Sequence, residues 1–362
     1  MTLEAGGGVW RYAVDAAKGM GERGVECLLV GFGPQLDRTQ RREIADLDNA
    51  HLIWIDTPAD RTATCDADLD RQPEILTRLA HDERVDLLHL NGPAQAAGLD
   101  SPVPVAIASH ACIATGWHAV DTVPWSADWS WRFRRNQRGF AAADAVIAPS
   151  ATHAEAVRRA YGLTVPVNVV HNAAVPSAGS RQRKRYVLAA GRWWDDEKNA
   201  ATIDSLAASL SVPVVMAGAL DEEGQGRFAP AHAIATGPLP PSEVRRLMGE
   251  AAVFVCASHY ESFGLSVLEA ASAGAALVLS DISTFRELWE GSAEFCAPDD
   301  TAGFAAAIEA LLADPARLEA MVTAATLRSR QFTPNHQVDQ LLDAYDAARV
   351  RRAERQPELI RA

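Results

Sequence analysis

Short apolar runs alternate with longer segments of helical periodicity along the chain. In the first half, six runs have the length of buried strands: Glu26–Gly31, His51–Ile55, Asp86–Leu90, Val103–Ala108, Asp144–Ala148 and Val167–Val170. Helical patterns lie between several of them. Because strands that alternate with helices form parallel sheets, we expect an α/β domain here.

The alternation starts again after Ser177–Arg185, a polar and basic stretch typical of a linker. The strand-like runs that follow are Tyr186–Ala190, Val212–Ala217, Ala233–Thr236, Val253–Ala257 and Ala276–Ser280, and three helical segments end the chain at Thr301–Ala313, Pro315–Arg330 and Asn335–Arg352. A chain of 362 residues also exceeds the usual domain of about 100–200 residues. We therefore predict two domains, 1–176 and 177–334, and a terminal helix within 335–362.

The beginning of the chain departs from this pattern. A helix is predicted over Val9–Arg23, directly after three glycines, but the strand expected before it is missing. Met1–Ala5 is too short and too polar for a buried strand, which usually has about five or six residues. We expect the natural start to lie upstream of Met1.

Composition and charge narrow the function classes. The chain is 48% hydrophobic and 22% charged, and no apolar run approaches the roughly 20 residues that span a bilayer. A net charge of −13 argues against nucleic-acid binding, which needs a basic surface. Five scattered cysteines without C-x-x-C spacing argue against disulfides and zinc sites, so we expect a reducing, cytoplasmic compartment.

Two carboxylates stand out between the runs Val253–Ala257 and Ala276–Ser280. Glu261 lies in the loop after the first run, and Glu269 follows eight positions later on a predicted helix that begins after the candidate N-cap Ser262 and ends at Gly274. Helix-start amides hold anions, and carboxylates accept hydrogen bonds from sugar hydroxyls. Two solvated carboxylates are the alternative interpretation.

The sequence of this stretch resembles the signature motif of a known family. E-S-F-G-L-S-V-L-E-A-A-S-A-G, followed by L-V-L-S-D-I-S-T-F-R-E-L, closely resembles the E-x7-E signature of glycosyltransferase family 4, the retaining sugar-nucleotide enzymes. Ala257 stands where the family usually has proline. The resemblance implies the glycosyltransferase B fold, in which two Rossmann-like domains with parallel sheets face a central cleft and the last helix crosses back to the first domain.

The resemblance also implies site residues in the second half. G-R-W-W-D-D-E-K-N is similar to the family's pyrophosphate motif, so Arg192 and Lys198 are expected to bind the diphosphate and act in catalysis, although a surface salt-bridge cluster is the alternative. Glu261 is expected to be catalytic and to hold the sugar hydroxyls or the developing charge, and Glu269 is expected to hold the ribose hydroxyls. The remaining expected nucleotide-binding positions are Phe263, Gly264 and Leu265.

In the first half the resemblance points to a glycine loop and a histidine. G-G-G-V-W-R-Y-A matches the family's cleft-facing loop, which makes Gly7 and Gly8 candidate binding residues, unless the glycines are only a flexible start. A-S-H-A-C places His110 where the family has a catalytic-site histidine near the donor sugar. A structural role for His110 is the alternative. His89 is interpreted as structural. Asn172-Ala173 replaces the family's usual asparagine-glycine turn.

Other charged segments leave alternatives open. Trp125–Phe140 combines aromatic residues with Arg132, Arg135 and Arg138, which is typical of either a membrane-surface helix or a core stripe with solvated arginines, and we favour the core stripe. The acidic triplet Asp66-x-Asp68-x-Asp70 is interpreted as solvated rather than metal-binding, and Arg286 and Glu287 are a possible pair.

The resemblance therefore implies a retaining transfer of a sugar from a nucleotide-diphosphate sugar to a hydroxyl of a glycan, lipid or small molecule. Neither a cofactor nor a metal is expected, and peripheral contact with the inner membrane surface remains an option. The alternatives are a non-catalytic nucleotide-sugar-binding scaffold, a sugar-nucleotide epimerase and a phosphorylase. A dehydrogenase is disfavoured because Gly31-x-Gly33 lacks the third glycine of the dinucleotide motif. The donor, the acceptor and the oligomeric state are left open.

Overall fold

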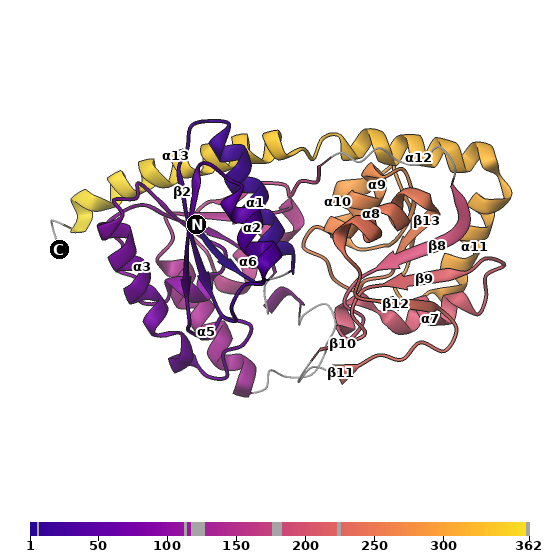
Figure 1. The fold of residues 1–362 in the computed structure, drawn as a ribbon, viewed down its shortest axis with the longest axis horizontal. Helices are drawn as coiled ribbons and strands as arrows, with labels where there is room; N and C mark the ends of the chain where they lie inside the picture. Colours follow the sequence, from indigo (N-terminus) through magenta and orange to yellow (C-terminus); the bar gives the residue numbers. More distant parts are fainter. Residues whose placement is uncertain (6, 112–113, 117–126, 176–182, 223–225, 360–362) are drawn as a thin grey trace. The chain divides into compact units, whose positions relative to one another are not determined.

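The structure is a computed structural model that describes residues 1–362 except 6, 112–113, 117–126, 176–182, 223–225 and 360–362. Its contacts divide the chain into two compact units. Unit 1 comprises Met1–Thr115, Thr122–Asn172 and Pro334–Ala362, and unit 2 comprises Gly116–Asp121 and Ala173–Thr333. Both units are built from parallel strands and helices (Figure 1), which confirms the predicted α/β class.

Unit 1 contains two parallel sheets. The first has the order β1-β2-β3 and is formed with its helices by β1 Thr2–Glu4, α1 Gly7–Gly21, β2 Cys27–Phe32, α2 Arg38–Ala45 and β3 Ala50–Ile55. The second has the order β4-β5-β6-β7 and is formed by β4 Leu88–Leu90, β5 Val105–Ala108, β6 Ala145–Ala148 and β7 Val167–Val169. Its helical elements are η1 Asp66–Leu69, α3 Arg71–Asp82, η2 Pro93–Ala96, α5 Ala127–Ala141 and α6 Ala151–Tyr161.

The first strand corrects one prediction. Met1–Ala5 was expected to form no strand, yet Thr2–Glu4 pairs in parallel with β2, with Thr2 opposite Val30. Leu3 is completely buried in the core beside α1, so tertiary pairing outweighs the weak local pattern. Among the described residues, no backbone ladder joins β1 to β4.

Unit 2 is one parallel sheet of six strands in the order β12-β9-β8-β13-β14-β15. Its strands are β8 Lys184–Ala190, β9 Val214–Ala217, β12 Ile234–Gly237, β13 Ala251–Cys256, β14 Ala276–Ser280 and β15 Glu294–Cys296, with a small hairpin of β10 Asp221–Glu222 and β11 Gly226–Arg227. Its helices are η3 Asp196–Lys198, α7 Ala200–Ala207, α8 Pro241–Glu250, α9 Leu265–Ser272, α10 Ser283–Trp289, α11 Thr301–Ala313 and α12 Pro315–Ser329. β10, β11 and β15 were not predicted.

Alternate residues of the central strands enter two hydrophobic cores. Leu188, Phe254 and Leu277 point to the core under α8, α9 and α10. Val187 and Val253 point to the opposite core under α7 and α11. A sheet buried on both faces explains why its strands are continuous apolar runs in the sequence.

The last helix, α13 Pro334–Leu359, belongs to unit 1, where it packs against α1, β5 and β6 (Figure 1, yellow). Val338, Leu341 and Tyr345 enter the core beside α1. The hydroxyl of Tyr345 hydrogen-bonds Nδ1 of His89 at 2.7 Å. Within the searched part of the chain, no helix is long and apolar enough to cross a membrane.

The basic face of α5 corrects one expectation. Arg135 is completely buried rather than solvated and binds Asp66 and Asp70 at 2.6 and 2.9 Å. Arg138 also binds Asp66 at 2.8 Å. The side chains of Asp66 and Asp70 remain 37% and 67% exposed, in agreement with their interpretation as solvated carboxylates. Arg132 binds Asp60. These partners lie far away in sequence, which explains why local periodicity did not reveal them.

The aromatic residues of α5 divide between core and surface. The ring of Phe133 stacks on Tyr161 with centroids 4.9 Å apart, whereas Trp129 is 38% exposed. Trp125 lies outside the described residues. The expected aromatic core stripe is therefore found only in part: Phe133 packs in the core, whereas Trp129 lies at the surface.

Candidate functional site

Unit 2 has its topological switch point between β8 and β13. From β8 the chain continues to β9 and β12 on one side, whereas β13 is followed by β14 and β15 on the other. Ligands of open parallel sheets bind at the carboxyl ends of the strands at such a point. The two segments that emerge there, 191–199 and 257–264, contain half of the expected site residues.

An ion pair joins these two segments. Nζ of Lys198 lies 2.7 Å from Oε1 of Glu261, and the two side chains are only 17% and 13% exposed. The hydroxyl of Ser258 donates to the same oxygen at 3.1 Å. Burial opposes the charged amine, but the attraction and hydrogen bond of Glu261 outweigh burial and raise the pKa of Lys198. Lys198 therefore remains a cation at neutral pH.

The backbone around this pair is fixed by Asn199, which the sequence analysis did not single out. Asn199 has a left-handed φ of 53°. Its side-chain amide donates to the backbone carbonyls of Ala257 and Pro298 at 3.1 and 2.9 Å. The amide of His259 donates to the carbonyl of Glu197 at 2.9 Å. These bonds hold the loop after β8 against the loop after β13. The lysine-asparagine dipeptide was the available sequence signal.

Arg192 lies at the same loop in a different environment. It is 57% exposed and binds Asp195 at 2.7 Å, and its guanidinium lies 5.4 Å from the centre of the Trp194 ring. Arg192 and Lys198 therefore contact different carboxylates. Since Arg192 is mostly exposed, an anion can replace Asp195 at little cost.

A second carboxyl group of the loop, Glu197, has an unusual protonation state. Its pKa is raised to about 7, first because it is buried and then because Asp195 and Glu261 are nearby. A proton therefore occupies Glu197 over much of the acidic range. The sequence analysis did not identify this residue.

The start of α9 corrects the expected cap. Gly264, and not Ser262, is the N-cap, and its φ of 86° is left-handed. A Cβ atom at Gly264 would lie 2.7 Å from the ring of Phe285, so glycine is required for both conformation and space. The α9 amides begin at Leu265, directly after the loop that holds Glu261. A helix start without a side-chain cap can bind an anion.

The other expected residues around α9 differ in their surroundings. The side chain of Phe263 is only 2% exposed and packs edge-on against Phe332, so it belongs to the core. Glu269 is partly buried and follows the first residue of α9, Leu265, by about 6 Å along the helix axis. Arg286 binds Asp281 at 2.7 Å and Glu290 at 3.1 Å, which replaces the suggested pairing with Glu287.

In unit 1, His110 follows β5 and belongs to a buried polar network. Its Nε2 lies 2.7 Å from Oδ1 of Asn91, and the amide of Asn91 donates to the carbonyl of Thr2 at 2.6 Å. Tyr12 of α1 packs against the imidazole with centroids 4.4 Å apart. Burial, followed by the nearby His153, lowers the pKa of His110 to about 4, so the ring is neutral at pH 7.

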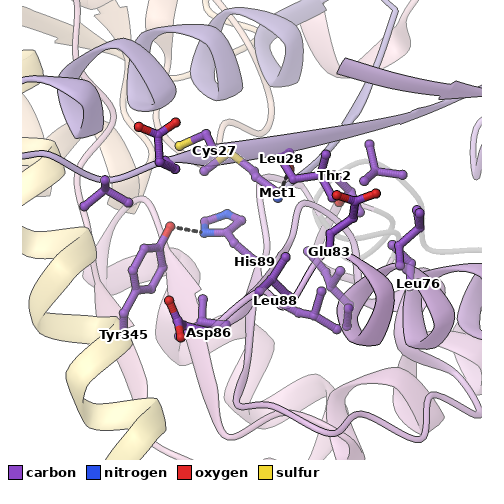
Figure 2. A pocket seen from close by; sticks show the side chains of 18 of the residues that line it. Met1, Thr2, Cys27, Leu28, Leu76, Glu83, Asp86, Leu88, His89 and Tyr345 are labelled. Atoms are coloured by element: carbon purple, nitrogen blue, oxygen red, sulfur yellow. Dashed lines mark hydrogen bonds between the residues drawn. The ribbon is translucent and has the colours of Figure 1, made fainter. Parts of the chain in front are cut away.

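The remaining first-half residues are placed as follows. Gly7 and Gly8 are the first two residues of α1, and Gly8 is exposed. His89 is buried and bonds to Tyr345 (Figure 2). It also bonds to Asn91, in keeping with a structural role. Asn172 is buried at the end of unit 1. In the searched part of the chain, no group of three or more His, Cys, Asp or Glu side chains is arranged to hold a metal ion.

Two family models match the chain, "Glycosyltransferase Family 4" over residues 6–177 and "Glycosyl transferases group 1" over residues 184–314. A glycogen synthase of Mycobacterium tuberculosis is 39% identical over 125 residues, which make up 34% of this chain and 30% of that protein. A GDP-mannose:cellobiosyl-diphosphopolyprenol alpha-mannosyltransferase of Komagataeibacter xylinus is 47% identical over 60 residues, 17% of this chain and 15% of that protein. The matched stretches thus span less than a third of these relatives.

Solved structures confirm the expected fold. Sucrose-phosphate synthase from Thermosynechococcus elongatus superposes with a TM-score of 0.77 at 15% identity, covering 95% of this chain and 94% of that one. HepE of Anabaena, solved in complex with UDP, superposes with a TM-score of 0.74 at 16% identity, covering 96% of this chain and 99% of that one. At such low identity, these similarities establish the glycosyltransferase B fold alone.

Proposed function

Because the chain belongs to the glycosyltransferases of family 4 and group 1, we propose that it moves a sugar from a nucleotide-diphosphate sugar to a hydroxyl acceptor with retention of anomeric configuration. The single observation that carries this proposal is the buried Lys198–Glu261 pair at the switch point of unit 2. It puts a permanent cation and a hydrogen-bond acceptor beside the start of α9, where a diphosphate and a sugar need them.

The diphosphate is held by positive groups in this proposal. Lys198 and the first amides of α9 bind its oxygens, and Arg192 leaves Asp195 to bind them from the exposed side. As the bond between the sugar C1 and the diphosphate oxygen breaks, negative charge grows on the leaving group. Fixed donors aimed at that charge lower the barrier, which also makes a metal ion dispensable.

The sugar is bound by carboxylates and its transfer needs no covalent enzyme intermediate. Glu261 accepts hydrogen bonds from sugar hydroxyls and keeps Lys198 in position, while Glu269 accepts from the ribose. The acceptor oxygen forms a bond to C1 on the face that the diphosphate leaves, and its proton passes to the diphosphate oxygen. His110 serves the sugar as a neutral hydrogen-bonding group.

A nucleoside diphosphate as the leaving group is supported by solved neighbours. HepE has been solved in complex with UDP and with UDP-glucose. The related mannosyltransferase of Komagataeibacter xylinus is named for GDP-mannose. We therefore propose a nucleoside-diphosphate sugar for this chain and leave the base to experiment.

The direct test is turnover with a panel of UDP-, GDP- and ADP-sugars and a mixture of hydroxyl acceptors, following release of the nucleoside diphosphate. We expect one donor to be consumed, with EDTA leaving the rate unchanged. Lys198→Met should lower the rate about 10²–10³-fold, the usual effect of losing one fixed charge-stabilising donor. Lys184→Met is the matched control, since Lys184 pairs with Glu250 at 2.8 Å but is 64% exposed.

A non-catalytic scaffold that binds nucleotide sugars is the alternative, and it predicts binding without release of a diphosphate. The distances of the pair do not separate the two proposals, so turnover decides. Consumption of a donor that Lys198→Met does not slow would contradict the assigned role of the lysine.

A further inference from the structure

Two neighbouring strands of unit 1 are followed by polar residues at the same edge of their sheet. Asn91 directly follows β4, and His110 follows β5, which pairs with β4. Ligands of parallel sheets bind at the carboxyl ends of the strands. Oδ1 of Asn91 lies 2.7 Å from Nε2 of His110 and 3.1 Å from Nε2 of His89. Two imidazoles therefore share one side-chain amide.

The orientation of the Asn91 amide follows from its other contact. Its nitrogen lies 2.6 Å from the backbone carbonyl of Thr2, and a carbonyl oxygen can only accept a hydrogen bond. The NH2 group must face Thr2, because the reverse orientation would bring two oxygens together. The backbone N–H of Asn91 also donates to the Thr2 hydroxyl at 2.8 Å. Oδ1 is thus the atom that meets both rings.

An oxygen at this position determines where the rings carry their hydrogens. Oδ1 is an acceptor with two lone pairs, so each imidazole must donate to it from Nε2. Burial lowers the pKa of His89 to about 3 and that of His110 to about 4, so both rings are neutral at pH 7 and carry one hydrogen each. Both histidines are therefore in the Nε2–H tautomer, in which Nδ1 has a lone pair.

The two histidines differ in their remaining contacts. His89 is only 2% exposed, and its Nδ1 lies 2.7 Å from the hydroxyl of Tyr345, which donates to the lone pair (Figure 2). Both nitrogens of His89 are therefore used inside the fold. His110 is only partly buried, and Tyr12 packs edge-on against its ring with centroids 4.4 Å apart. Asn91 and Tyr12 together keep this ring in one orientation at the edge of the sheet.

We propose that Asn91 is a positioning residue that holds His110 in the Nε2–H tautomer, so that Nδ1 accepts a hydrogen bond from one hydroxyl of the donor sugar. The sugar contact rests on the proposed function, whereas the tautomer does not. The hydroxyl at His110 must donate its hydrogen to the ring. The site therefore distinguishes a hydroxyl from a group of similar size that can only accept, such as fluorine.

The tautomer is measured without any substrate. In histidine labelled with nitrogen-15, ring nitrogens with and without hydrogen have well-separated NMR shifts, and the variants His89→Gln and His110→Gln assign these two rings among the ten histidines. We expect Nε2–H for both rings at pH 7. Asn91→Leu should leave His110 in a mixture of tautomers, whereas Asn91→Asp should keep Nε2–H because a carboxyl oxygen still accepts there. An Nδ1–H tautomer of His110 in the unchanged chain, or no change in Asn91→Leu, would overturn the proposal.

The requirement for a donating hydroxyl is tested by kinetics. The donor consumed in the turnover panel, beginning with UDP-glucose and GDP-mannose, is compared with analogues in which one hydroxyl away from C1 and C2 is replaced by fluorine or hydrogen. At one position both replacements should lower kcat/KM at least about tenfold, since they leave an acceptor in the site unpaired. In Asn91→Leu, where Nδ1 can carry the hydrogen, fluorine should cost less than about threefold. The electronic effect of fluorine is the same in both proteins and cancels.

Gln95→Leu is the matched control. Gln95 is 3% exposed and accepts from the Thr2 hydroxyl at 2.6 Å, so its loss disturbs the same network but leaves the acceptor of the two rings in place. It should change the rates with the hydroxyl and fluorine donors by the same factor. Equal factors in Asn91→Leu as well would mean that Asn91 acts on stability alone, which would overturn the proposal.

Failure of this proposal and failure of the proposed function give different results. If no donor is consumed while His110 has the Nε2–H tautomer, the proposed function and the sugar contact are both refuted. If a donor is consumed but His110 has the other tautomer, or fluorine is tolerated at every position tested, the role of Asn91 is refuted and the proposed function stands.

Discussion

The Lys198–Glu261 pair makes a quantitative prediction about stability. At 2.7 Å and an effective dielectric constant of about 20, two unit charges attract by roughly 6 kcal/mol. Much of this is offset because both groups have lost water. Removing one partner leaves the other charge buried, so we expect Lys198→Met to lower the free energy of unfolding by about 2–4 kcal/mol, somewhat below a fully buried pair because of the residual exposure.

A double-mutant cycle isolates the pair. Lys198→Met, Glu261→Gln and the double variant are unfolded in urea at low nucleotide concentration. Because the second change removes the carboxylate that the first left unpaired, the double variant should lose less than the sum of the single losses, with a coupling energy of about 1–3 kcal/mol.

Lys184 and Glu250 provide the matched control. They have the same residue types at 2.8 Å, but their side chains are 64% and 20% exposed. The cycle Lys184→Met with Glu250→Gln should give a coupling energy of only about 0–1 kcal/mol. Equal coupling energies in the two cycles, or additive losses at Lys198 and Glu261, would refute the reasoning that burial makes the site pair strong.

Three further predictions concern single residues. Gly264→Ala should lower the free energy of urea unfolding by about 2–4 kcal/mol, since it adds overlap with Phe285 to backbone strain. Gly291→Ala is the control, because Gly291 has a φ of 75° and open space around it, and it should cost only about 1 kcal/mol. Equal losses would contradict the role assigned to the overlap. The pKa of Glu197 is raised to about 7, so its protonated form stabilises the folded state and this contribution declines as pH rises from about 4.5 to 7. Glu197→Gln should remove that decline in stability between pH 5 and 8. A variant with the same pH profile as the unchanged chain would count against the raised pKa. The pKa of His110 is lowered to about 4, so the contribution of this residue to stability is present above pH 6.5 and is lost as pH falls toward 4. His110→Gln should therefore flatten the fall in Tm over that pH range. A Tm that falls as steeply in the variant as in the unchanged chain would argue against a neutral ring.

The strands of the fold could be predicted because their cause is local. A central strand of a parallel sheet must be apolar on both faces, so it is visible in the sequence as a continuous apolar run such as Ala276–Ser280. Thr2–Glu4 lacks that signal, since its pairing with β2 and the burial of Leu3 are tertiary effects. The hairpin β10–β11 and the strand β15 are too short for periodicity to identify.

The candidate site was predictable as a set of residues but not as a set of contacts. The motifs named Lys198, Arg192 and Glu261, yet only the adjacency of β8 and β13 brings the lysine to Glu261. The arginine instead pairs with Asp195 three residues away in its own loop. Local rules favoured Ser262 as the helix cap, whereas the conformation of Gly264 determines the actual cap. The roles of these residues in binding and transfer stay predictions.

Calorimetric titration of the chain with UDP, GDP and ADP tests the central claim most directly. The account predicts that one of them binds, that Lys198→Met weakens this affinity at least tenfold, and that Lys184→Met leaves it unchanged. If no nucleoside diphosphate or its sugar binds at millimolar concentration, or if Lys198→Met binds as tightly as the unchanged chain, the carboxyl ends of β8 and β13 are not a diphosphate site.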